Sequence, residues 1–177
     1  SNIVHDIRTL YEPRWTRRGK WNQSYYEARV PRVPTMLLEL LSHQNFADMR
    51  YGIDPRFRFT VSRAIYKGML QFLCSQYRMD YIVQPLPVDH MALRMIGENE
   101  IELTWEAVND PLEPTAAPEK YIVYTRIGNG DFDNGTVVDK NSYRTVLPAG
   151  IVCSYKVTAL NKGGESFPSE ILSAGQA

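Results

Sequence analysis

The sequence predicts a two-domain α+β chain in which a partial α/β unit precedes an all-β sandwich. Residues 1–80 contain 13 Lys and Arg against 7 Asp and Glu, whereas residues 81–177 contain 7 against 13, so the net charge changes sign along a chain that is neutral overall. The apolar pattern also changes, from helical spacing in the first half to alternation over short runs in the second. We therefore expect a first unit at 1–78, a proline-containing linker at 79–89 and a sandwich at 90–177.

Composition excludes several classes of protein. Hydrophobic residues make up 44% and charged residues 23%, as in ordinary globular proteins, and no apolar run is long enough to span a membrane. Cys74 and Cys153 fall in different units, so no disulfide framework is predicted. Arginines spread along helices usually form a solvated face, and no nucleic-acid partner is predicted. We expect the chain to be an internal fragment of a longer protein.

Two helices are predicted in the first unit. Ile3, Ile7 and Leu10 have the spacing of one helix face, and Pro13 ends that helix. Asp54-Pro55 is a typical helix start, and the apolar face that follows predicts a second helix to about Ser75.

Two strands are predicted between these helices. Residues 24–30 form one, and the apolar run that begins at Val33-Pro34 forms a buried strand with Glu39 near its end. A carboxylate at the end of a buried strand is either solvated or part of a catalytic or metal site, and the pattern alone favours the solvated alternative.

The loop Arg14–Trp21 is basic and aromatic. Arg and Trp together are typical of a platform for nucleic acid or glycan, because they bind anions and stack on flat rings. The alternative, which we expect, is that Trp15 and Trp21 pack on their own domain.

The run after Val33-Pro34 resembles the last strand of zinc-dependent N-acetylmuramoyl-L-alanine amidases (amidase type 3), whose pattern is V-P-A-V-L-V-E-x-G-F-x-S-N. Val33-Pro34, Leu37-Leu38-Glu39 and Asn45 match that pattern, and Arg18-Gly19 matches the family's Arg-Gly turn, which follows a helix and precedes the next strand. Leu41 and Ser42 depart from it, because the family usually has Gly-Phe there.

The resemblance implies that Glu39 is the general acid/base and that Arg18 and Asn45 belong to the binding site. It covers only the second half of the family domain, and the family's zinc ligands would lie in sequence that is not present. We therefore expect zinc in the parent enzyme but no metal and no activity in this chain alone. A half-domain also leaves a truncated sheet edge, through which we expect a homodimer or a strand swap.

The second half has the pattern of a β-sandwich, with about seven short strands separated by turns. Trp105, Tyr121 and Tyr155 occupy aromatic positions of fibronectin type III domains, and the run from Tyr155 to Glu170 matches that family's Y-x-V-x-A-x-N-x-x-G-x-S-x-P-S-E signature. The resemblance implies an immunoglobulin-like sandwich and says little about function. The strands are expected at 90–95, 101–106, 120–126, 136–138, 143–147, 153–159 and near 170–172.

Three functions follow from these patterns. The first is a fragment of a secreted bacterial cell-wall hydrolase that acts on peptidoglycan, located outside the cell or in the periplasm. The second is a non-catalytic spacer or adhesion module. The third is an accessory region of a polysaccharide lyase of the xanthan type or of another carbohydrate-active enzyme. The partner that we expect is peptidoglycan or another glycan polymer.

Overall fold

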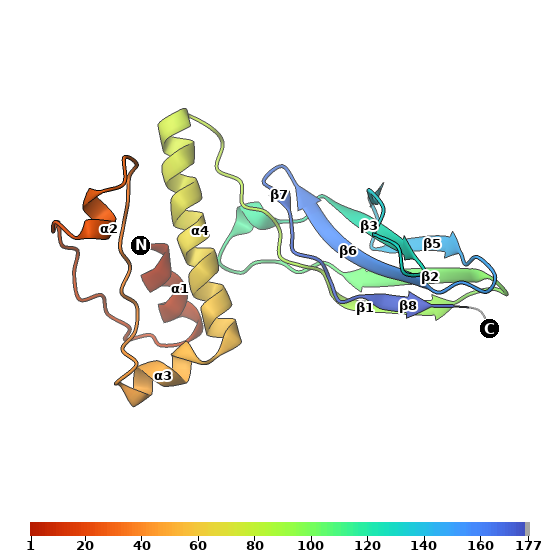
Figure 1. Cartoon of the computed structure of the whole chain (residues 1–177), viewed down its shortest axis with the longest axis horizontal. Helices are drawn as coiled ribbons and strands as arrows, with labels where there is room; N and C mark the ends of the chain where they lie inside the picture. The colour runs from red at the N-terminus through yellow and green to blue at the C-terminus, as the bar shows by residue number, and fades with distance from the viewer. Residues whose placement is uncertain (176–177) are drawn as a thin grey trace. The chain divides into compact units, whose positions relative to one another are not determined.

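The computed structural model describes residues 1–175, which fold as two units (Figure 1). The first unit comprises residues 1–76 and is helical, and the second begins at Tyr77 and is built from strands. Within the described residues, no helix combines the length and the apolar character needed to cross a membrane.

The first unit contains α1 (Asn2–Leu10), α2 (Tyr26–Arg29), α3 (Phe46–Gly52) and α4 (Pro55–Tyr77). The two helices that the apolar spacing predicts, α1 and α4, lie close to their expected bounds. The start of α4 also forms as predicted, because Asp54 Oδ1 accepts a hydrogen bond from the backbone N–H of Arg56 at 2.8 Å.

The two strands expected in this unit are not formed. Residues Tyr26–Arg29 make the single helical turn α2, and residues 34–42 have no regular secondary structure. A strand is stable only when neighbouring strands take up its backbone N–H and C=O groups, and residues 1–76 contain no strand that does so. The prediction of a partial α/β unit is therefore wrong for this part of the chain, which is all-helical in the structure.

The core of the first unit is small and largely aromatic. Ile7 of α1 and Phe57 and Val61 of α4 are buried at its centre. Tyr11 and Tyr51 pack on Phe57, with ring centroids 5.1 Å and 5.3 Å away. Aromatic rings therefore cover one side of a core that contains few aliphatic side chains.

A buried ion pair joins α1 to α4. Lys67 Nζ lies 2.7 Å from Asp6 Oδ2, and each side chain is only 3% exposed. His5 Nδ1 lies 3.0 Å from the other carboxylate oxygen of Asp6. Moving a charge out of water is unfavourable unless an opposite charge lies beside it. The burial of Asp6 therefore depends on Lys67, and the burial of Lys67 depends on Asp6.

Two antiparallel sheets make up the second unit. One contains β1 (Asp89–Met95), β2 (Glu100–Glu106) and β5 (Ser142–Val146) in the order β1-β2-β5. The other has the order β4-β3-β6, and both β7 and β8 pair with β6. Two antiparallel sheets with this strand order form a β-sandwich of the immunoglobulin-like kind, as the sequence predicts. The strands of the second sheet are β3 (Lys120–Ile127), β4 (Thr136–Val138), β6 (Cys153–Asn161), β7 (Gly164–Glu165) and β8 (Leu172–Ala174), and a short 3₁₀ helix, η1 (Pro114–Ala116), precedes β3.

The inward side chains of the two sheets form one core. Leu103 and Trp105 of β2 face Tyr121 and Val123 of β3, and the rings of Trp105 and Tyr121 meet edge to face at 5.4 Å. Tyr155 is buried at the centre of β6, and this burial raises the pKa of its hydroxyl. The aromatic positions that carry the fibronectin type III resemblance are thus core positions.

The strand bounds follow the sequence prediction with two differences. The prediction omits β7, because two residues are too few to show alternation, and the last strand lies at Leu172–Ala174, slightly after its expected position. The residues expected to form a linker lie within the second unit, where Val83, Pro85 and Val88 are buried.

Candidate functional site

The three site residues taken from the amidase resemblance share no contact that the structure records. Glu39 and Arg18 are exposed, and neither side chain makes a hydrogen bond or an ion pair within residues 1–175. Asn45 caps α3, because its Oδ1 accepts a hydrogen bond from the Ala47 N–H at 2.9 Å. In this chain Asn45 therefore has a structural role that accounts for its position.

The residues present do not fit a zinc site. In the described part of the chain, no three His, Cys, Asp or Glu side chains are grouped so that they would hold a metal ion. A catalytic zinc needs three protein ligands around an open position. Zinc in the parent enzyme stays a prediction about sequence that is not present here.

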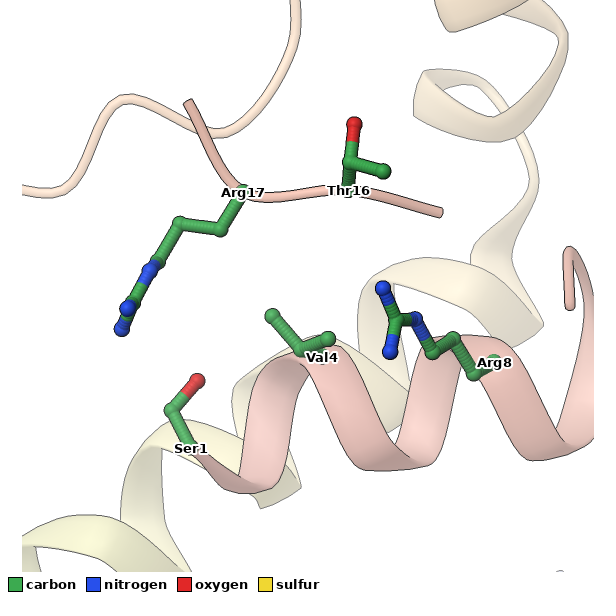
Figure 2. Close-up of a pocket in the computed structure, with 5 residues that line it drawn as sticks. All are labelled: Ser1, Val4, Arg8, Thr16 and Arg17. Atoms are coloured by element: carbon green, nitrogen blue, oxygen red, sulfur yellow. The ribbon is translucent and has the colours of Figure 1, made fainter. Parts of the chain in front are cut away.

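A shallow hollow lies between α1 and the chain that follows it (Figure 2). It has a volume of about 370 Å³ and is lined by Ser1, Val4, Arg8, Thr16 and Arg17. Arg8 braces one side, because its Nε donates to the carbonyl oxygen of Trp15 at 2.6 Å. The residues that line the hollow include no carboxylate, and Arg8 and Arg17 make it basic.

The best-defined polar site lies in the second unit and holds the chain that leads into the sandwich. We call residues 81–88 the leading segment. Asn161, at the end of β6, is buried and donates through Nδ2 to the carbonyl oxygens of Val83 at 2.9 Å, Thr115 at 3.1 Å and Ala117 at 3.2 Å. Its Oδ1 accepts the Gly163 N–H at 2.7 Å. One amide side chain therefore joins the leading segment, η1 and the turn after β6.

A glutamate and a glycine complete this attachment. Glu113 is buried and accepts the Tyr81 hydroxyl at 2.7 Å and the Thr115 hydroxyl at 2.8 Å. Gly163 lies directly on the backbone of the leading segment, because a Cβ at this position would be 2.5 Å from the carbonyl oxygen of Ile82. The leading segment is thus held by side chains and by a close approach of backbone to backbone.

A cation–aromatic cluster lies on the outer face of the sheet that contains β3 and β6. Lys156 Nζ lies 5.1 Å from the ring centroid of Tyr124 and 4.4 Å from that of Phe132, and Arg126 lies 5.0 Å from the same Phe132 centroid. The Tyr124 hydroxyl donates to Glu165 at 2.7 Å, which raises the pKa of Tyr124 to about 12. The cluster secures the turn between β3 and β4, and its ring faces are already in contact with cations.

The outer face of the other sheet carries a row of three charges. Arg94, Glu102 and Arg144 are direct cross-strand partners on β1, β2 and β5. Arg94 donates to Glu102 through Nε at 2.8 Å and also through Nη2, and Arg144 donates through Nε at 2.9 Å. These hydrogen bonds lower the pKa of Glu102. Cross-strand pairs of this kind stabilise a sheet.

The two tryptophans of the basic loop behave differently. Trp15 packs on the core of the first unit, as expected, with its ring centroid 6.0 Å from that of Phe57. Trp21 is 64% exposed, so the expectation that both pack on the domain is wrong for Trp21. The sequence gives no signal that separates the two, because both follow an Arg or Lys in the same loop.

Sequence reasoning also missed the attachment of the leading segment. The available signal was Asn161, the asparagine of the fibronectin type III signature.

Comparison with known proteins finds similarity to solved structures. No family model and no curated protein matches the sequence. Similar solved structures include titin kinase with its flanking domains (19% identity, 53% of this chain and 17% of that chain, TM-score 0.45). A human fourth FNIII domain (22% identity, 52% and 79%, TM-score 0.46) and an FN3tt mutant (17% identity, 51% and 94%, TM-score 0.43) are also similar. The chain thus spans under a fifth of the titin kinase structure, and the fold assignment rests on the strand order described above.

Proposed function

We propose that this chain is a non-catalytic spacer module of a larger protein. The observation that supports it is the attachment of the leading segment to the sandwich by Asn161, Glu113 and Gly163. A spacer fixes the separation of the parts that it joins only if the chain entering it is attached to the module. A flexible linker does not fix that separation. The sandwich interior is filled with side chains, as a structural module requires.

The cation–aromatic cluster favours a spacer over adhesion by this sheet face. A sugar ring binds an aromatic side chain through the ring face, and the faces of Tyr124 and Phe132 are in contact with Lys156 and Arg126. A Cβ on Gly135 would lie 2.9 Å from a ring atom of Tyr124, so this glycine packs closely against that ring.

The catalytic alternatives stay predictions about a longer parent protein. A zinc amidase acting on peptidoglycan would need the strand that carries Glu39, which the helical first unit does not form. A polysaccharide lyase of the xanthan type has no further support. Location outside the cell or in the periplasm also stays a prediction.

Limited proteolysis tests the proposal. Chymotrypsin cleaves after tyrosine, and Tyr77 is 72% exposed, whereas Tyr81 is half-buried and hydrogen-bonded to Glu113. We expect early cleavage after Tyr77 and none after Tyr81 while the sandwich is folded. Early cleavage after Tyr81 would show a free linker and refute the spacer. Release of soluble fragments from peptidoglycan or xanthan by the purified chain would refute the non-catalytic assignment.

A further inference from the structure

The chain between α1 and α3 carries an uncompensated positive charge. Residues 14–32, which we call the cationic segment, contain six Arg and Lys residues and one acid, Glu27. All six basic side chains are exposed, and none forms an ion pair within the described residues. The basic residues are Arg14, Arg17, Arg18, Lys20, Arg29 and Arg32. Surface cations are usually interspersed with acids, so a run of this kind is a candidate binding surface for an anion.

Exposed aromatic rings lie among these cations. Trp21 is 64% exposed and Tyr26 is 68% exposed, and Tyr25 is also on the surface. Trp21 packs on Gly19, where a Cβ would lie 3.1 Å from the indole ring, so the ring has a defined support. Large aromatic side chains are costly to leave in water and mark interaction surfaces when they gather with arginine.

The basic hollow adjoins this segment. Arg17 belongs to the cationic segment and lines the hollow together with Arg8 (Figure 2). Figure 2 shows the two arginines on opposite sides of Val4, with their guanidinium groups apart from each other. The surface therefore offers separated cations, with an apolar floor between them and aromatic rings further along the segment.

We propose that the cationic segment binds a carboxylated polysaccharide. Such a polymer carries one charge per sugar or per repeat, and its sugar rings present flat C–H faces to aromatic side chains. In the cationic segment, basic residues precede and follow a group of exposed rings, from Trp21 to Tyr26, so charges and rings are available to different sugars of one polymer. Double-stranded DNA fits less well, because it carries one charge per ~1.7 Å of helix axis and needs a continuous cationic track.

Polysaccharide binding goes beyond the spacer function and concerns the first unit, whereas the spacer function depends on the second. An experiment that refutes one of these proposals therefore does not refute the other. The full chain is titrated with polygalacturonate and with its methyl-esterified form, which has the same sugar backbone without the charge. We expect binding to polygalacturonate that weakens as salt is raised, and much weaker binding to the ester. Equal binding to both polymers, or no binding to either, would overturn the proposal.

Variants locate the surface. Trp21→Ala is expected to weaken binding about tenfold, as loss of one stacking ring does. The pair Arg17→Gln and Arg18→Gln is expected to weaken binding roughly two- to fivefold for each charge removed. Phe46→Ala and Arg50→Gln are the matched controls, because both residues are exposed in the same unit outside the cationic segment.

These five substitutions replace exposed side chains, so the variants are expected to keep the circular dichroism spectrum of the parent. Equal losses in the control variants would refute the assignment to the cationic segment. Tighter binding to single-stranded poly(dT) than to polygalacturonate at the same salt concentration would replace the polysaccharide with nucleic acid.

Discussion

Replacing Asn161 by alanine should destabilise the sandwich, because this side chain joins three parts of the second unit. Its Nδ2 donates to three backbone carbonyls, and its Oδ1 accepts one N–H. An amide has two N–H groups, so one of the three donor contacts is shared. Three effective hydrogen bonds at about 1 kcal/mol each give an expected loss of about 3 kcal/mol, which is more than a hundredfold in the folding equilibrium.

Urea unfolding measured by NMR provides the assay. The indole N–H signal of Trp105 reports the second unit alone, because this ring lies in the sandwich core. Asn129→Ala is the matched control, since Asn129 lies exposed in the turn after β3 and is expected to change stability by less than about 0.5 kcal/mol. Asn161→Asp should be at least as damaging as alanine, because it places a carboxylate against three carbonyl oxygens. If Asn161→Ala matched Asn129→Ala, the reasoning about the attachment would be refuted.

Three further predictions test other contacts. Gly163→Ala should lower stability in thermal unfolding by about 1–3 kcal/mol, because its Cβ would lie 2.5 Å from a backbone atom. Gly68→Ala on α4 places its Cβ in open space and should raise stability by about 0.5–1 kcal/mol. A stabilising Gly163→Ala together with a destabilising Gly68→Ala would contradict the packing described. The two neighbouring arginines lower the folded-state pKa of Glu102, so their stabilisation is present above its ordinary value of 4.5 and is lost as pH falls through the lowered value. Glu102→Gln should therefore flatten the dependence of Tm on pH between about pH 2 and pH 5, and an unchanged slope would exclude this role. Lys67→Met should lower the free energy of unfolding of the first unit in urea by roughly 3–5 kcal/mol, because it leaves Asp6 buried without its partner. The double variant Lys67→Met with Asp6→Leu should lose much less. Losses that add in the double variant would show that the pair is not coupled.

The sandwich was predictable because its signals are local. Alternation along β2 places Leu103 and Trp105 in the core, and the signature after Tyr155 fixes the last part of the module. Turn residues separate the strands, so each strand is recognisable without knowledge of its neighbours.

The first unit was only half predictable for the converse reason. The helices α1 and α4 satisfy their own backbone groups, and spacing and capping predict them. A strand at 33–40 depends on partner strands, and an apolar run gives no information on whether they exist. The amidase resemblance supplied that assumption, and residues 1–76 contain no such partner.

The candidate sites were also predictable only where the contacts are local in the sequence. Asn45 was found from sequence but has a capping role, and Glu39 and Arg18 are exposed. The attachment of the leading segment depends on contacts between residues about 80 positions apart, such as Val83 and Asn161. Sequence spacing alone does not show contacts of that range.

Amide hydrogen exchange at Val83 tests the central claim that the leading segment is an integral part of the sandwich. The Val83 N–H donates to Thr115 Oγ1 at 3.1 Å, and the side chain is fully buried. We expect Val83 to exchange with the same opening free energy as Val157 in the centre of β6, because both amides open only when the module unfolds. Exchange at Val83 close to the rate of an unstructured peptide, with Val157 still protected, would contradict it.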